Sequence, residues 1–142
     1  ARAFQMDVIH HTRTPTGEEG WTEDLDDLLT RSGVVSIHVP LTAATRGLID
    51  RRRIGLMRPE AIVVNTARGA ILDEEALAEA LSDGRVFAAG LDVYTREPHV
   101  SPRLLAAPRA DVRLAGVDIQ PTRRTREAML RLAAEKMAAY LA

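Results

Sequence analysis

The chain has 142 residues, a formal net charge of -1 and no cysteine. The near-neutral charge argues against a nucleic-acid or anionic-membrane binder held by bulk charge, no apolar run approaches the roughly 20 residues of a membrane span, and the lack of cysteine excludes disulfides, thiolate metal sites and cysteine nucleophiles. The length favours one domain with a real core, in which roughly 70% of the unfolded surface can be buried, and a reducing, cytoplasmic compartment fits this composition.

Short apolar runs alternate with helix-like segments along the chain. The apolar runs are predicted to form strands at residues 6–11, 34–39, 61–65 and 86–93, with a weak strand near 112–114. Helices are predicted at residues 22–29, about 50–57, from Asp73 to Gly84 and from about Arg123 onward. Thr22 and Asp73 are suitable N-caps, Gly33 and Gly84 suitable stops, and a loop rich in proline and arginine spans about 95–110.

The composition of the two middle strands indicates how the sheet is covered. Residues 34–39 and 61–65 are apolar nearly throughout, which is typical of strands with helices on both faces. Strands and helices that alternate at this spacing are joined by right-handed crossovers in a parallel sheet. The sequence therefore predicts an α/β fold with a doubly wound parallel sheet.

Polar residues follow each predicted strand. In an open parallel sheet, ligands bind just beyond the carboxyl ends of the strands. These ends carry Thr12-Arg13-Thr14, Pro40-Leu41-Thr42, Thr66-Ala67-Arg68-Gly69, and Asp92 followed by Glu97. The pattern fits a binding cleft at one edge of the sheet, although turns that are simply polar would produce the same pattern.

Arg68 is the sharpest single candidate for ligand binding. It follows a buried strand and precedes Gly69, and its planar fork suits a carboxylate or a phosphate. The alternative is an ion pair with a helix acid such as Glu74. Glu97 could pair with Arg68, assist a catalytic base, or be a solvated loop acid. His10 and His11 are adjacent on a predicted strand and point to opposite faces, so they cannot chelate one metal ion, and no metal site is predicted.

Several ordered segments carry a resemblance to a known family. They are His38-Val-Pro-Leu-Thr42, Thr45-Arg-Gly-Leu-Ile-Asp50, Val64-Asn-Thr-Ala-Arg-Gly69, Asp73-Glu-Glu-Ala-Leu77, Ala89-Gly-Leu-Asp-Val93 and Glu97-Pro98. Their order and spacing resemble the D-isomer-specific 2-hydroxyacid dehydrogenases, and glyoxylate/hydroxypyruvate reductases most of all. The resemblance implies a Rossmann-type domain that binds NAD(P) and an enzyme that acts on a small 2-keto or 2-hydroxy acid.

The resemblance also implies roles for individual residues. Arg68 matches the arginine that binds the substrate carboxylate and polarises its carbonyl group. Glu97 matches the acid that hydrogen-bonds the catalytic histidine and raises its pKa, which favours the imidazolium that donates a proton during carbonyl reduction. The positions that match the lining of the dinucleotide site are Val39, Pro40, Thr45, Thr66, Ala67, Arg68 and Asp92.

Three features depart from the family pattern. The first strand and its Gly-rich phosphate loop are absent, and residues 1–5 resemble the end of the helix that follows that loop. The substrate domain is absent as well. Alignment on Thr122 places Val117 or, after a shift, Asp118 at the position of the catalytic histidine.

Residues 1–142 are therefore predicted to be a partial dinucleotide-binding domain with weak or no oxidoreductase activity of its own. A non-catalytic dinucleotide-binding or interaction module, or a truncated fragment of such an enzyme, remains the alternative. The uncovered sheet edge also predicts a homo-oligomer.

The end of the first predicted strand bears on cofactor choice. NAD-preferring Rossmann domains place an acid there, which accepts a hydrogen bond from the ribose 2′-hydroxyl. This chain has Thr12 and Arg13 instead. Arg13 can pair with a 2′-phosphate through its fork, so we expect NADPH to bind better than NADH. Arg13 could instead point to solvent or pair with Glu18.

Overall fold

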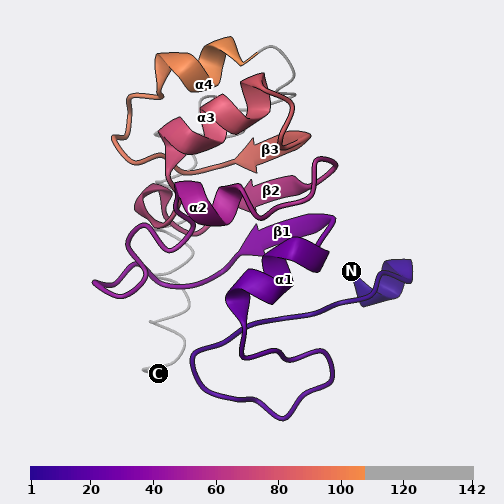
Figure 1. Cartoon of the computed structure of the whole chain (residues 1–142). Helices are drawn as coiled ribbons and strands as arrows, with labels where there is room; N and C mark the ends of the chain where they lie inside the picture. Colours follow the sequence, from indigo (N-terminus) through magenta and orange to yellow (C-terminus); the bar gives the residue numbers. More distant parts are fainter. Residues whose placement is uncertain (108–142) are drawn as a thin grey trace, which may run out of the picture.

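A computed structural model describes residues 1–107 of the chain. Three short parallel strands form one sheet in the order β1-β2-β3 (Figure 1). The strands are β1 (Val34–Ile37), β2 (Ile62–Asn65) and β3 (Ala88–Leu91). The helices are α1 (Leu25–Arg31), α2 (Arg51–Ile54), α3 (Glu74–Ser82) and α4 (Pro102–Ala106), with 3-10 turns η1 (Arg2–Phe4) and η2 (Gly69–Ile71).

The register of the sheet brings the carboxyl ends of the three strands together. Ile37 lies beside Asn65, and Asn65 lies beside Leu91. The residues that follow this row therefore emerge at one edge of the sheet, which is where the sequence predicts a binding cleft.

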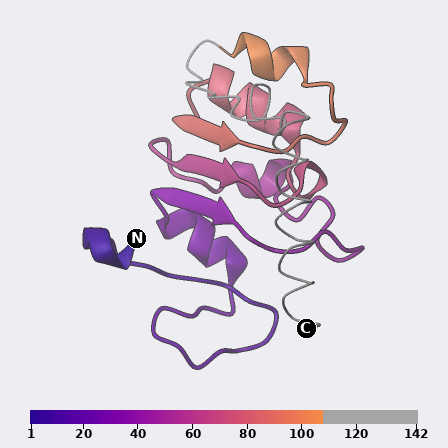
Figure 2. The same cartoon turned by 180° about the vertical axis from the view of Figure 1, so that it is seen from behind.

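One face of the sheet is buried beneath helices. Figure 1 shows α1, α2 and α3 in front of the strands and α4 beyond α3, and Figure 2 shows α1 to α3 behind the strands when the molecule is turned. Strand residues alternate accordingly: Val35, Ile37, Val63, Ala89 and Leu91 are buried on the helix side, whereas Val34 and Ser36 on the other side are exposed. The parallel α/β order is confirmed. Within residues 1–107, α1 to α3 cover a single face of the sheet, and α4 lies against α3.

Aspartate caps define where the helices begin. The side chain of Asp73 accepts a hydrogen bond from the Ala76 amide at the start of α3, as predicted. Asp50 caps α2 in the same way, through the amide of Arg53. The prediction of Thr22 as the first cap is wrong: Asp24 caps α1 and accepts from the two amides that follow Leu25. Asp24 takes this role because its carboxylate accepts from two of the free amides of the first turn.

Two further predictions need correction. Residues 6–11 are not a strand and carry only an isolated parallel bridge between His10 and Trp21. A strand needs a neighbour for its backbone groups, and no strand of the described part pairs with residues 6–9. The predicted loop at 95–110 contains α4. The sequence feature that indicates the start of this helix is Pro102 in the first turn, directly after Ser101.

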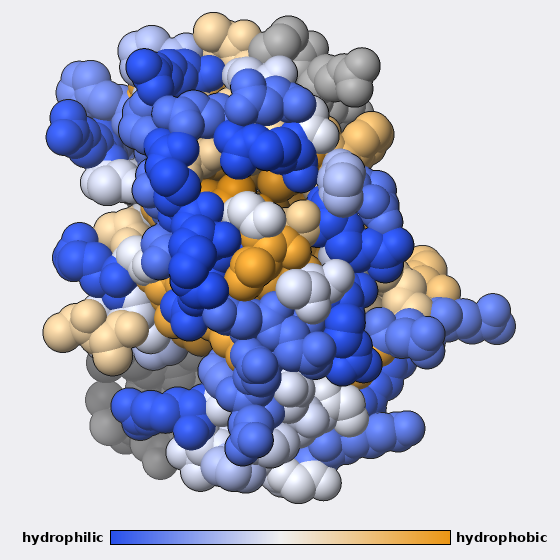
Figure 3. Space-filling model, viewed as in Figure 1, coloured by the Kyte–Doolittle hydropathy of each residue, from blue (hydrophilic) through white to orange (hydrophobic). Residues whose placement is uncertain are grey.

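Figure 3 shows a mostly hydrophilic helix-covered face with apolar side chains in a central strip. In the described part of the chain, no helix is long and apolar enough to cross a membrane. The predicted strand near 112–114, the helix from about 123, and Val117 and Asp118 lie outside the described residues.

Candidate functional site

The loop that follows β2 is tied to its own strand. Asn65, the last residue of β2, is fully buried. Its side-chain oxygen accepts a hydrogen bond from the Ala67 amide at 3.0 Å, and its side-chain nitrogen donates to the Arg68 carbonyl at 3.0 Å. The backbone of Asn65 also accepts from the Asp92 amide at 3.0 Å, which links the ends of β2 and β3. One buried residue therefore holds both the turn and the neighbouring strand end.

The same loop lies directly against the loop that follows β3. A Cβ atom on Gly69 would come within 2.0 Å of the Tyr94 carbonyl carbon and 2.4 Å of the Thr95 nitrogen. Only glycine permits this approach of two backbones. The close contact fixes the segment that carries Arg68 relative to the segment that carries Glu97.

Carboxylates hold the loop after β3 in place. Glu97 accepts a hydrogen bond from the Tyr94 amide at 3.0 Å. Glu74, at the start of α3, accepts from the hydroxyl of Thr95 at 2.8 Å and also from its amide. Burial raises the pKa of the Tyr94 phenol, and the nearby charges of Glu74, Asp92 and Glu97 raise it further. Tyr94 therefore stays protonated and donates to the Leu91 carbonyl at 3.0 Å.

The guanidinium of Arg68 is exposed at this edge of the sheet. It donates to the neighbouring Ala67 carbonyl at 2.6 Å. Among residues 1–107, no ion pair joins Arg68 to Glu74 or to Glu97. Both pairings considered from the sequence are therefore absent there, and the fork of Arg68 is available to an anion from outside.

The loop after β1 is closed by a threonine. The hydroxyl of Thr45 donates to the Pro40 carbonyl at 2.6 Å and accepts from the Thr42 amide at 2.8 Å. Val39 and Thr45 are half-buried, and Pro40 is exposed. Together with exposed Thr66 and Asp92 and half-buried Ala67, they follow the ends of the three aligned strands.

Thr12 and Arg13 lie in a different kind of segment. Residues 12–19 are all exposed, and Trp21 donates to the Thr12 hydroxyl at 3.0 Å. In the described part, no hydrogen bond joins Thr12 or Arg13 to the loops after β1, β2 or β3. Glu18 lies 3.9 Å from His10 and makes no ion pair with Arg13 there. The structure therefore brings the sheet-edge candidates together and leaves Thr12 and Arg13 on a separate loop.

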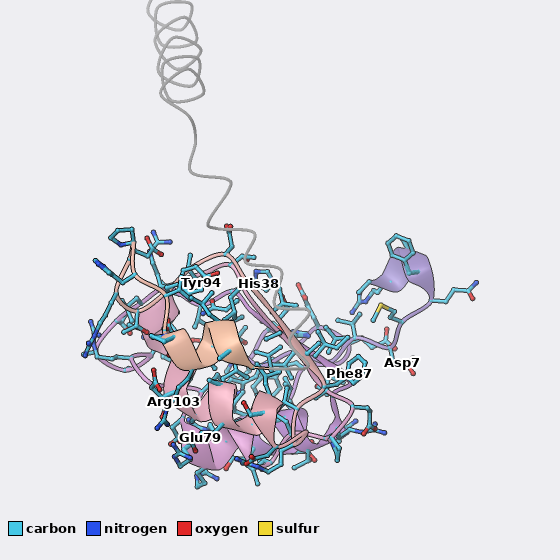
Figure 4. The ribbon with its side chains drawn as sticks, turned by 90° about the horizontal axis from the view of Figure 1, so that it is seen from above. Asp7, His38, Glu79, Phe87, Tyr94 and Arg103 are labelled. Atoms are coloured by element: carbon cyan, nitrogen blue, oxygen red, sulfur yellow. The ribbon has the colours of Figure 1, made fainter. Side chains whose placement is uncertain are left out.

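Figure 4 shows where these features lie on the molecule. Phe87 precedes β3 and Tyr94 follows it, at opposite ends of the strand, while Glu79 and Arg103 lie on the helix side. Arg103 donates to Glu79 at 3.2 Å, which links α4 to α3. Within residues 1–107, no group of three or more His, Cys, Asp or Glu side chains could hold a metal ion. The chemistry available at the sheet edge is therefore a cationic fork beside carboxylates and backbone groups.

The NAD binding domain of the D-isomer specific 2-hydroxyacid dehydrogenases matches residues 1–113. The chain belongs to this family. The resemblance found in the sequence is confirmed, and so is the Rossmann-type parallel order of the fold. Within residues 1–107, the part of this chain that matches the NAD binding domain consists of three strands, the helices between them and the loops at the carboxyl ends of the strands.

Individual members of the family resemble this chain over most of its length. A glyoxylate reductase from Aeropyrum pernix is 42% identical over 98% of the chain and 43% of its own length. A hydroxypyruvate reductase from Thermotoga maritima is 53% identical over 69% of the chain and 33% of its own length. The crystal structure of an NADPH-dependent glyoxylate/hydroxypyruvate reductase from Sinorhizobium meliloti, in complex with NADP and malonate, has a TM-score of 0.78 and 29% identity, and covers 99% of the chain and 44% of its own. The chain thus spans less than half the length of these relatives.

Two residues that organise the site were missed as functional candidates. Asn65 and Tyr94 make the buried polar contacts that shape the loops after β2 and β3. A polar amide at the end of an otherwise apolar run was the available signal for Asn65. Tyr94 bonds within its own segment, to Leu91 and Glu97, and no sequence pattern marked this local turn.

Proposed function

We propose that this chain is the dinucleotide-binding part of an NAD(P)-dependent oxidoreductase that interconverts 2-keto acids and 2-hydroxy acids by hydride transfer. Membership in the family and the reductases among its relatives support this proposal. Glyoxylate and hydroxypyruvate are the proposed substrates. The nicotinamide cofactor supplies the hydride when it is bound.

The observation that carries the proposal is the exposed fork of Arg68, which forms no ion pair within residues 1–107 and stands on a turn that Asn65 holds at the sheet edge. A planar guanidinium in this position can bind a substrate carboxylate through two parallel hydrogen bonds. The same fork can withdraw electron density from the adjacent keto oxygen. Val39, Pro40, Thr45, Thr66, Ala67 and Asp92 are proposed to line the dinucleotide.

Glu97 is proposed to act through a histidine in the assembled site. A carboxylate beside an imidazole stabilises the protonated form, which is the proton donor that carbonyl reduction needs. In this structure Glu97 accepts a hydrogen bond from the Tyr94 amide, so one of its oxygens is already fixed. Since the sequence has Val117 or Asp118 at the matching position, we expect reduction of glyoxylate to be lower than in a family enzyme by a factor of about 10²–10⁴ or more.

A second candidate is a non-catalytic module that binds a dinucleotide without turnover. The absence of histidine after His99 in the sequence favours it. The two functions differ in what Arg68 does, because a module has no need to bind a 2-keto acid.

The experiment measures binding of NADPH, binding of oxalate and oxidation of NADPH in the presence of glyoxylate. The oxidoreductase proposal expects oxalate binding that Arg68→Ala weakens about tenfold or more, while Arg85→Ala, which alters an arginine paired with Asp83 near the start of β3, leaves it unchanged. NADPH binding without any binding of oxalate would support the module. Binding of neither ligand would overturn both candidates.

We also propose that the chain self-associates. β1 pairs on one side with β2, and within residues 1–107 no strand lies on its other side. Val34 and Phe87, at the starts of β1 and β3, are 45% and 58% exposed. Uncovered strand edges and apolar side chains promote association, so light scattering should give a mass above that of one chain. A concentration-independent single-chain mass would contradict this.

A further inference from the structure

We propose that Asn65 is a positioning residue whose buried amide fixes the Thr66–Arg68 turn and thereby the direction of the Arg68 guanidinium. The inference rests on the proposed role of Arg68 in binding a carboxylate. It adds to that role the residue that acts through Arg68 without touching the ligand itself.

The hydrogen bonds of Asn65 span the turn. Its oxygen accepts from the Ala67 amide and its nitrogen donates to the Arg68 carbonyl, each at 3.0 Å. A donor and an acceptor of one rigid, planar group therefore bond to two successive residues. Because the side chain of Asn65 is fully buried, water cannot replace either partner without opening the core.

Asparagine is the residue type that this geometry requires. Its amide carries one acceptor and one donor group a single methylene from the backbone. Ionised aspartate has the acceptor but no donor for the Arg68 carbonyl. Leucine has nearly the same shape but neither polar group, and glutamine places the amide one methylene too far along the chain.

The far end of the turn is held by a second contact. Gly69 lies against the backbone of Tyr94 and Thr95, so close that no side chain fits between them. The turn is thus bonded to Asn65 from within and blocked by the loop after β3 beyond Arg68. Arg68 itself is exposed, and the one hydrogen bond of its guanidinium in the described structure goes to the adjacent Ala67 carbonyl. The backbone therefore sets the Cα–Cβ direction from which the guanidinium extends, and Asn65 holds that backbone together with the Ile71 amide, which donates to the Arg68 carbonyl at 3.3 Å.

The test compares wild type with Asn65→Leu, Asn65→Asp and the control Val63→Ala. Val63 is fully buried two residues earlier on the same face of β2, so its truncation weakens the strand without removing a hydrogen bond from the turn. Two quantities are measured in each protein. One is the hydrogen-exchange rate of the Ala67 amide, and the other is the dissociation constant of oxalate, followed through the Arg68 side-chain NMR signal.

We expect Asn65→Leu to raise the oxalate dissociation constant about tenfold or more and to speed exchange of the Ala67 amide. Val63→Ala should leave the oxalate dissociation constant within about twofold of wild type, because the Val63 side chain makes no hydrogen bond to the turn and both bonds of Asn65 remain. If Asn65→Leu and Val63→Ala change oxalate binding equally, Asn65 has only a structural role and the inference is wrong.

Asn65→Asp supplies a pH readout that loss of stability alone would not produce. A protonated carboxyl has an O–H group that can donate to the Arg68 carbonyl, whereas the ionised form has none. Burial raises the pKa of such a carboxyl, so oxalate binding by this variant should approach wild type at low pH and be lost as pH rises. Arg68, Asp92, Glu97 and Glu74, the charged groups around the turn, are common to both proteins, and the comparison with wild type removes their contribution. A variant profile parallel to that of wild type would overturn the inference.

Failure of the proposed function gives a different result. If Arg68→Ala does not weaken oxalate binding in the wild-type background, Arg68 does not bind the carboxylate and the proposed function is wrong. The positioning role of Asn65 is then decided by the Ala67 amide alone. Fast exchange in Asn65→Leu and slow exchange in Val63→Ala support that role, and equal rates in the two variants overturn it.

Discussion

The loop after β2 and the loop of residues 12–19 both carry proposed ligand contacts, but the protein holds them in opposite ways. The first has a buried amide beneath it and a backbone contact at Gly69, and Ile71 within it is fully buried. The second is exposed along its whole length, and Thr12 and Trp21 contact each other through one side-chain hydrogen bond.

The two loops therefore differ in the conformational entropy that they lose when a ligand binds. A turn that is already fixed loses little further conformational freedom when a ligand arrives, whereas an exposed loop must be ordered at that moment. Arg68 is therefore suited to orienting a small reacting group. Arg13 is suited to discriminating between NADPH and NADH, which differ by one phosphate. For this role the side chain must reach the phosphate, and its exact orientation matters less.

The largest effect is expected from a substitution that disrupts the loop after β2. In Gly69→Ala, the added methyl group would overlap the Tyr94 carbonyl carbon, and no rotamer change can relieve a clash with backbone. We expect the free energy of unfolding to fall by about 3 kcal/mol or more, measured by urea denaturation. The control is Gly33→Ala, because a Cβ at Gly33 meets nothing within 4 Å, and it should change stability by less than about 0.5 kcal/mol. Equal stability of the two variants would show that the loops after β2 and β3 are not held together.

The next effect concerns the exposed loop. Arg13→Ala should weaken NADPH binding by about 10–150-fold, the range for a charge-assisted hydrogen bond, and leave NADH binding unchanged. Trp21 is the single tryptophan of the chain and contacts Thr12, so its fluorescence reports binding at this loop. Arg31→Ala, which removes an arginine paired with Asp27 on α1, serves as the control. If NADH binds as tightly as NADPH, or if Arg13→Ala keeps its NADPH affinity, the cofactor assignment is wrong.

A smaller effect is expected from the ion pairs that join α1 to α2. Asp26 in α1 accepts hydrogen bonds from Arg52 at 2.6 Å and Arg53 at 2.9 Å, which tie α1 to α2. These bonds lower the pKa of Asp26 to about 2. Since the folded pKa lies below the unfolded value of about 4, the stabilisation is present above pH 4 and is lost as pH falls towards 2.

The matching variant is Asp26→Asn. Its melting temperature should lie below that of wild type at pH 7, and the gap should close near pH 2. Asp27→Asn, which loses only a pair with Arg31 on the same helix, should show a smaller gap at pH 7. If the two variants melt together at pH 7, the link between α1 and α2 contributes nothing measurable.

Local signals in the sequence predicted the features that depend on neighbouring residues. The apolar runs at 34–39 and 61–65 gave two of the strands, and Asp73 gave the start of α3, because strands and caps follow from short-range patterns. The failure at residues 6–11 has the opposite cause. That run has strand composition, but a strand also needs a partner, and pairing is decided by distant parts of the chain.

The residues of the candidate site likewise include some that the sequence predicted and others that it did not. The position of Arg68 at the sheet edge followed from the order of strands, and its lack of a partner in the described structure agrees with a role in ligand binding. The double hydrogen bond of Asn65 and the contact at Gly69 could not be foreseen, since each depends on the three-dimensional path of a turn. Sequence thus pointed to Arg68 as the proposed ligand-binding residue, and only the structure located what holds it.

The buried amide of Asn65 has a consequence for protein engineering. The backbone of the turn is fixed by the hydrogen bonds of Asn65 in β2 and by the close approach of Gly69 to the loop after β3. The side chains at positions 66 and 68 are exposed and contribute little to the backbone conformation. Both are exposed and can be randomised together while residues 65 and 69 are kept. Libraries built in this way would sample new substrate groups on an unchanged scaffold, and variants that fail should fail in recognition while their folding is preserved.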